Sequence, residues 1–229
     1  MIFFEDASIP LEAILLGVNI AAAVIILFGF WLYNRSTHGI SAGTWFILAS
    51  GEFLDFGSYW DMVGGDFLEL FTALRLGTSL SEVSVGEEWI KSMVPAAFAL
   101  GTIGTFLLAL LRRRFSWPDA NDWFIIFIDA LITVYWISSG AAVTTNLLFQ
   151  GTTIMAFIPM YRALHSGKEV ETFWPWMLWT TAYVGFLFTA FMSFGDQPAE
   201  IAYPTVGVIT HAIVIMYVLR GSKKVEARP

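Results

Sequence analysis

Two acidic residues, Glu52 and Asp55, are the first candidates for chemistry because they interrupt a strongly apolar stretch of the chain. They are three residues apart, so a helix would place both on one face. An ionisable group within the hydrocarbon of a membrane costs several kcal/mol unless it is paired or hydrated, which makes each one a functional candidate. His211 interrupts another apolar stretch. We therefore predict that Glu52, Asp55 and His211 handle a coupling proton.

A second group of residues has the donors, acceptors and rings that would bind a small polar solute. Amide and phenol groups can exchange hydrogen bonds with solute hydroxyls, and indole rings can stack on an apolar ring face. The predicted substrate-binding residues are Asn19, Trp45, Asn146, Gln150, Trp176 and Tyr183. The competing interpretation is that the amides and His211 only hold helices together, at about 0.6–2 kcal/mol for each hydrogen bond. Asp129 is interpreted as structural or as facing a neighbouring copy.

The elements that must position these residues are membrane-spanning helices. Hydrophobic residues make up 57% of the 229-residue chain and charged residues 14%, against about 25% charge in a soluble domain. A helix needs about 20 mainly apolar residues to cross the hydrocarbon. Seven segments satisfy this: 9–33, 41–62, 92–111, 122–139, 141–163, 172–194 and 201–220. A six-helix alternative would make 122–139 a re-entrant segment.

The charges predict how these helices are oriented. Ten of the twelve basic residues lie in or beside the segments 34–40, 112–121, 164–171 and 221–229, which seven crossings place on one side. Basic loops face the cytoplasm, so we predict a multi-pass cell-membrane protein with its N-terminus outside and its C-terminus in the cytoplasm. The long outer loop, 63–91, is expected to contain a short helix at Asp66–Leu76; a flexible acidic loop is the alternative.

The two halves of the chain show a faint internal repeat. A shift of 131 positions aligns Trp45 with Trp176, Glu52 with Tyr183 and Asn19 with Gln150, and a shift of 109 aligns Pro95 with Pro204. We predict an all-α fold of two three-helix repeats joined by one linker helix. Because three helices and the linker cross the membrane four times, the second repeat begins on the same side as the first, and the two repeats are parallel. The parts of this fold are residues 1–112, linker helix 113–140, residues 141–220 and a basic tail, 221–229. Chance similarity between apolar helices is the alternative.

The basic loops carry a resemblance to a known family. Residues 33–41, which lead into the second helix, and Ile158-Pro159-Met160-Tyr161-Arg162 through Lys168, which lead into the sixth, resemble the PQ-loop/SWEET-type transporter superfamily. The resemblance implies three helices, a linker helix and three helices, with a sugar, an amino acid or a vitamin as the transported solute. The chain departs from the family pattern at Met160, where Gln is usual. The first copy has neither Pro nor Gln, and the usual prolines of helices 1 and 2 are missing.

Several function classes lack the residues that they require. A retinal protein needs a Lys in the last helix, and 201–220 has none. There is no cysteine, nucleotide-binding motif or hydrolase motif. We therefore expect no cofactor, metal site, nucleic-acid partner or enzymatic activity, although an intramembrane or lipid-modifying enzyme stays an alternative.

The leading hypothesis is a proton-coupled secondary transporter or facilitator for a small polar solute. We expect the protein to contact the lipid bilayer and to form a homo-oligomer. The rival is a non-transporting membrane subunit or receptor that binds a partner through its outer loop. Geometry separates the two. A shared hydrated cavity around Asn19, Glu52, Gln150, Tyr183 and His211 would favour transport, and scattered, individually satisfied side chains would favour the rival.

Overall fold

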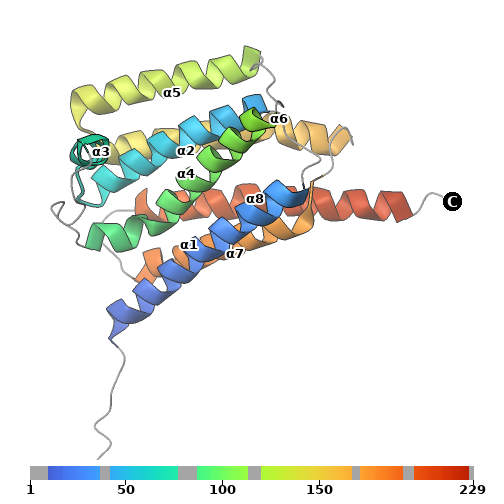
Figure 1. Cartoon of the computed structure of the whole chain (residues 1–229), viewed down its shortest axis with the longest axis horizontal. Coiled ribbons are helices and arrows are strands. Elements are labelled where there is room, and N and C mark those ends of the chain that lie inside the picture. Colours follow the sequence, from blue (N-terminus) through green and yellow to red (C-terminus); the bar gives the residue numbers. More distant parts are fainter. Residues whose placement is uncertain are drawn as a thin grey trace, which may run out of the picture.

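Helices are the regular secondary structure of the described part of the chain. The structure is a computed structural model that describes residues 10–36, 42–76, 87–112, 120–166, 171–192 and 199–226, and these contain no strand. Seven long helices form one bundle, and the short α3 lies across its edge (Figure 1). The helices are α1 (Leu11–Ser36), α2 (Ala42–Met62), α3 (Phe67–Leu76), α4 (Glu87–Leu111), α5 (Ala120–Ser139), α6 (Ala142–Ser166), α7 (Phe173–Met192) and α8 (Ala199–Glu226).

Hydropathy places this bundle in a membrane. Four helices have segments that are long and apolar enough to cross one, and these are Leu11–Arg35, Trp89–Leu111, Ala120–Ser139 and Ala199–Arg220. The protein is therefore an all-α membrane protein. Each of the seven predicted segments falls on one long helix. The crossings of α2, α6 and α7 remain a prediction, because acids, amides, Thr and Trp lower the hydropathy of these helices.

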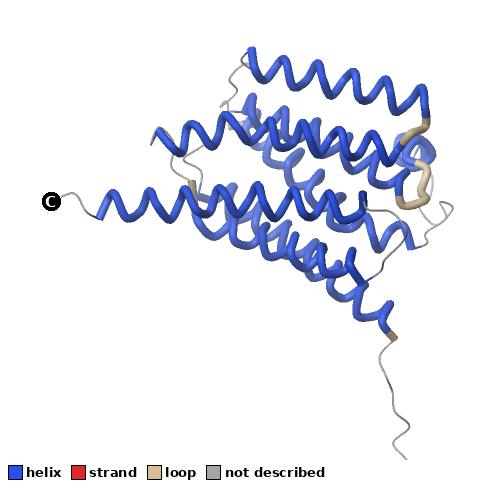
Figure 2. The backbone as a smooth tube through the Cα atoms, turned by 180° about the vertical axis from the view of Figure 1, so that it is seen from behind, coloured by secondary structure: helices blue, strands red, loops and turns tan. Residues whose placement is uncertain are grey.

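Six of the long helices close into a ring around a shared core. Going around it, α1 packs on α4, α4 on α2, α2 on α6, α6 on α8, α8 on α7, and α7 again on α1. Helix α5 lies outside the ring against α6 and α2, at one edge of the bundle in both views (Figures 1 and 2). Neighbours in the ring are therefore mostly not neighbours in the sequence.

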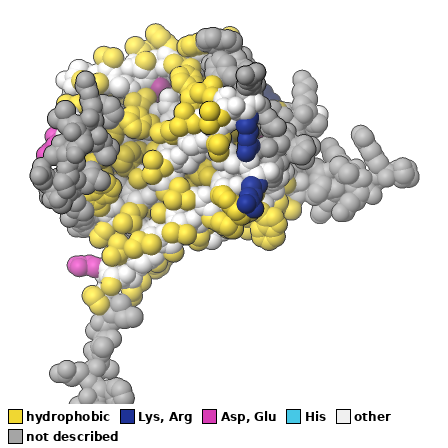
Figure 3. Space-filling view, in the orientation of Figure 1, with side chains coloured by type: hydrophobic (Ala, Val, Ile, Leu, Met, Phe, Trp, Pro, Cys, Tyr) yellow, Lys and Arg dark blue, Asp and Glu magenta, His cyan; other side chains and the backbone are white. Residues whose placement is uncertain are grey.

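The outer surface of the bundle is apolar, as contact with lipid requires. Large hydrophobic side chains are exposed along α1 and α5, including Val24, Phe127 and Ile137. Figure 3 shows hydrophobic side chains spread over the visible face. The interior holds an aromatic core together with many buried polar residues, among them Glu52, Asp55 and Asp129. Polar groups thus face inward, which is the arrangement expected in a membrane.

Local chemistry fixes the turns at one end of the bundle. Gly140 has φ +65, a left-handed conformation that favours glycine, and it separates α5 from α6 at the predicted break. The predicted outer helix is present as α3. Its first backbone N–H, at Phe67, donates to Asp61 Oδ1 at 2.6 Å, and Asp61 Oδ2 accepts a hydrogen bond from Trp136 Nε1 at 3.0 Å. Asp61 therefore ties α3 and α5 to the end of α2. Residues 77–86 of the 63–91 loop lie outside the described residues.

Candidate functional site

A carboxyl–amide cluster joins α2 to α6 inside the bundle. Asp55 Oδ1 accepts a hydrogen bond from Asn146 Nδ2, and Asp55 Oδ2 accepts one from Gln150 Nε2, each at 2.7 Å. The two amides are four residues apart, which puts both on the face of α6 that meets α2. Ser58 lies 3.3 Å from Asn146 Nδ2. Asn146 Oδ1 is buried without a hydrogen-bond partner, so the cluster retains one unused acceptor.

Glu52 connects α2 to the other side of the ring. Its Oε2 accepts a hydrogen bond from the hydroxyl of Tyr203, on α8, at 3.3 Å. That hydroxyl lies 3.4 Å from the hydroxyl of Tyr183, on α7. All three side chains are buried. The predicted residues Glu52 and Tyr183 thus meet through Tyr203, which brings three helices together.

His211 is hydrogen-bonded within its own helix and lies apart from Glu52. Its Nδ1 lies 2.8 Å from the carbonyl oxygen of Gly207, one turn earlier in α8. Five rings surround the imidazole at centroid distances of 5.1–5.9 Å, from Phe98, Phe157, Trp176, Trp179 and Tyr183. The ring contact with Tyr183 brings His211 near the acids, because the hydroxyl of Tyr183 lies 3.4 Å from that of Tyr203.

The remaining predicted residues lie apart from the acids. Asn19 Nδ2 donates to the carbonyl of Ile90, and Asn19 Oδ1 accepts a hydrogen bond from Thr189 at 2.9 Å. Trp45 packs edge-on against Phe30 and Tyr33. Asn19 is therefore satisfied between helices, and Trp45 belongs to the aromatic core.

Trp176 links that core to the loop that precedes α7. Its Nε1 donates to Glu171 Oε2 at 3.1 Å, and Tyr33 on α1 donates to Glu171 Oε1 at 3.4 Å. Glu171 is buried. This clasp ties the last part of α1 to the start of α7, at the end of the bundle that the charges predict to be cytoplasmic.

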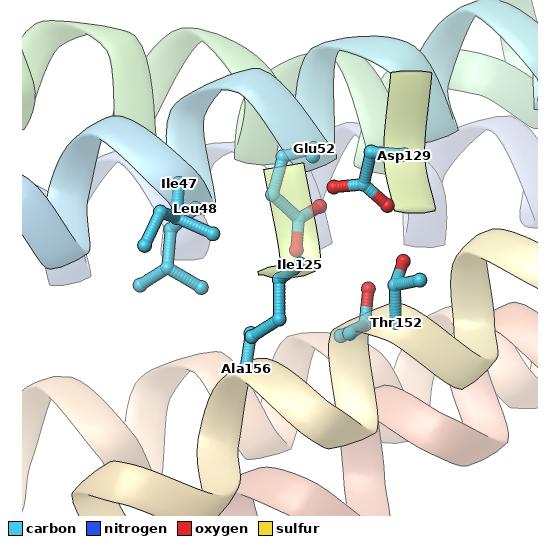
Figure 4. Close-up of a pocket in the computed structure, with 9 residues that line it drawn as sticks. Ile47, Leu48, Glu52, Ile125, Asp129, Thr152 and Ala156 are labelled. Atoms are coloured by element: carbon cyan, nitrogen blue, oxygen red, sulfur yellow. The ribbon is translucent and has the colours of Figure 1, made fainter. Parts of the chain in front are cut away.

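A small crevice lies beside Glu52, between α2, α5 and α6. Its volume is about 10 Å³, close to the minimum that one water molecule needs. Glu52 and Asp129 contribute carboxyl groups to it, Thr152 contributes a hydroxyl, and residues such as Ile47 and Ile125 close its apolar side (Figure 4). Asp129 is buried against α2 and α6, which fits the structural interpretation and contradicts its alternative, that Asp129 faces a neighbouring copy. Sequence alone did not orient the polar face of α5.

Sequence reasoning missed three residues of this region: Tyr203, Ser58 and Glu171. Tyr203 could have been found, because it lies two turns before His211 and one turn before Gly207 on the same face of α8. Ser58 follows Asp55 by three residues in the same way. Glu171 carries no such signal, because it lies in a loop whose fold depends on its neighbours.

The basic residues of the described helices lie away from Glu52, Asp55 and Asp129. The Lys and Arg residues of the described helices lie near helix ends, as Lys91 does, 3.7 Å from Glu200 at the start of α8. Among the described residues, no group of three His, Asp or Glu side chains could hold a metal ion. The buried acids must therefore be neutralised by a proton or a bound cation, or be stabilised by polar hydrogen-bond donors.

Comparison of the chain with protein-family models, with curated proteins and with solved structures finds no match.

Proposed function

We propose that the chain is a small secondary transporter or facilitator for a small polar solute, coupled to protons through Glu52. The observation that carries the proposal is the placement of two buried acids, Glu52 and Asp55, where two groups of helices meet. One group consists of α1, α2 and α4, and the other consists of α6, α7 and α8. Asp55 reaches α6, and Glu52 reaches α8.

The packing of the helices supports two equivalent units. Exchanging α1, α2 and α4 for α6, α7 and α8 leaves the ring unchanged, because the third helix of each group packs between the other two. The first helix of each group meets the second helix of the other, as α1 meets α7 and α6 meets α2. This pattern supports the predicted parallel repeat, the seven crossings and the likeness to the PQ-loop/SWEET-type plan, with α5 as the linker helix.

The contacts between the units are the ones that a rocking motion would change. Hydrogen bonds cross the seam at Asp55, at Glu52, between Asn19 and Thr189, and between Tyr33 and Glu171. Alternating access moves one repeat against the other around a fixed midplane site. Polar contacts can re-form with water or solute as the seam opens, which apolar packing cannot do.

The conformation described here is closed around the acids. A crevice of about 10 Å³ is far too small for a sugar, an amino acid or a vitamin, since ligand pockets usually measure about 300–1,000 Å³. Solute binding therefore requires the two units to separate along the seam. The unpartnered Asn146 Oδ1 would then be available to a solute hydroxyl.

Flux measurements test the proposal. Purified protein in proteoliposomes is offered sugars, amino acids and vitamins with and without a pH gradient. We expect the wild type to accumulate one of these solutes when the gradient is present. Glu52→Gln should abolish this accumulation, while Glu12→Gln, at an exposed acid on α1, should not. Accumulation by Glu52→Gln equal to that of the wild type would reject the proton role.

The subunit or receptor alternative is decided by the same assay. A folded wild type that neither moves nor binds any solute of the three classes would overturn the transport proposal. The loop helix α3 would then be the next surface to test for a protein partner, since Leu68 is exposed on it.

A further inference from the structure

The crevice between α2, α5 and α6 has features that the proposed transport mechanism does not use. It places the carboxyl group of Asp129, on the linker helix, beside that of Glu52 (Figure 4). Asp129 is only 4% exposed and Glu52 8% exposed. Asp129 Oδ1 is buried without any hydrogen-bond partner. A buried carboxylate oxygen in that position costs free energy unless something else binds it.

The surroundings limit what that occupant can be. The crevice is lined by carboxyl and hydroxyl oxygens on one side and by apolar side chains on the other, and its described lining residues include no Lys or Arg. Its volume of about 10 Å³ admits about one water-sized body. Ca²⁺ takes about six to eight oxygen ligands and Mg²⁺ a full octahedron, more than this small crevice offers. A single monovalent cation fits the oxygen donors and the space, and it neutralises one of the two carboxylates.

We propose that Glu52, Asp129 and Thr152 form a site for one small monovalent cation, Na⁺ or a proton shared between the two carboxyl groups. The inference rests on the proposed function, because Glu52 is its coupling residue, and it names the second acid of the coupling-ion site. It also gives α5 a role beyond linking the two units. Since α5 lies outside the ring, the cation would join the linker helix to the first unit at α2.

Thermal unfolding of the purified protein in detergent tests this site without any solute or flux. The melting temperature is measured in NaCl and in N-methyl-D-glucamine chloride at equal ionic strength, from pH 5.5 to 8.5. If Na⁺ binds, it should raise the wild-type melting temperature in a saturable way and less at low pH, where protons occupy the carboxylates. Asp129→Asn should lose the whole Na⁺-dependent rise.

Two further variants separate cation binding from a general effect on folding. Gly51 lines the crevice, and a Cβ added there would lie 3.7 Å from Asp129 Oδ2. Gly51→Ala should therefore fill the site and lose the response with both acids intact. Gly151→Ala is the matched control, because a Cβ there would meet nothing within 4 Å, and it should respond as the wild type does.

The measured melting temperatures either identify the bound cation or reject the proposed site. A Na⁺-dependent rise that both crevice variants lose identifies Na⁺. A pH-dependent melting temperature without any Na⁺ effect, flattened in both variants, identifies the proton. Wild-type responses in Asp129→Asn or in Gly51→Ala overturn the proposal, as does a wild type that responds to neither ion. A failure of solute flux alone would leave these outcomes unaffected, so the two proposals fail separately.

Discussion

Asp55 is the residue on which the contact between the two units depends most clearly. Both of its carboxyl oxygens accept hydrogen bonds from amide nitrogens of α6, at 2.7 Å. Asp55→Asn would replace one acceptor oxygen by an NH₂ group that faces another NH₂ donor. We expect a loss of about 1–3 kcal/mol of unfolding free energy, because a buried donor is left unsatisfied. The loss should appear as a lower melting temperature in detergent.

A matched substitution controls for the change of Asp to Asn itself. Asp66 accepts a hydrogen bond from the backbone N–H of Glu69 in the exposed first turn of α3, and Asn caps a helix about as well as Asp does. Asp66→Asn should therefore leave the melting temperature nearly unchanged. Equal stability of both variants would show that the Asp55 contacts do not hold α2 to α6.

At the residue scale, the sequence predicted which side chains are buried better than it predicted their neighbours. Glu52, Asp55, Asn146, Gln150 and Tyr183 were selected because polar residues in apolar helices turn inward, and all five are buried. Residue spacing determines the face of a helix but not the helix that this face meets. For that reason Asn19 was grouped with residues that it does not touch, and the burial of Asp129 against α2 and α6 was only one of two alternatives.

Close approach between helices is controlled at the element scale by a few glycines. A Cβ added at Gly29, on α1, would lie 2.5 Å from Trp179 Nε1 on α7. The indole cannot retreat, because it is buried and donates to the carbonyl oxygen of Ile26 at 3.1 Å. We expect Gly29→Ala to destabilise the protein by about 1–3 kcal/mol through overpacking.

Gly17, on the same helix, provides the comparison for this prediction. A Cβ at Gly17 would meet nothing within 4 Å, so Gly17→Ala should be neutral or should stabilise α1 by up to about 1 kcal/mol. Thermal unfolding of the two variants in one detergent measures the difference. Similar melting temperatures for both would contradict the tight packing of α1 on α7.

Element boundaries were largely predictable, whereas the order of packing was not. Apolar runs and the Ser138–Gly140 break predicted helix ends to within a few residues, as 122–139 against Ala120–Ser139 shows. Helix α8 continues beyond residue 220 to Glu226, because membrane thickness limits the apolar run and not the helix. The closed ring arises from contacts between distant helices, for which a single sequence carries only the weak signal of a repeat.

Two features involve the whole molecule: the separation of acidic and basic residues between the two ends of the helices, and the closed ring of six helices. Helix α1 has Glu12 in its first turn and Arg35 in its last turn, and the side of the membrane on which each of them lies stays a prediction. A parallel repeat needs both units to cross the membrane in the same sense. Measuring the direction in which one helix of each unit crosses the membrane therefore tests the parallel repeat.

The absence of cysteine from the sequence makes this orientation directly measurable. Ser138 is the second-to-last residue of α5, just before the turn into α6, Ser166 is the last residue of α6, and both side chains are exposed. The 25-residue helix between them is about 37 Å long at 1.5 Å per residue, enough to cross the hydrocarbon. In intact cells, a membrane-impermeant maleimide should label Ser138→Cys but should label Ser166→Cys only after permeabilisation. Reversed labelling would invert the orientation, and labelling of both positions from outside would mean that α6 does not cross. The seam between the two units could not then open alternately to the two sides, because α6 supplies both amides that bind Asp55.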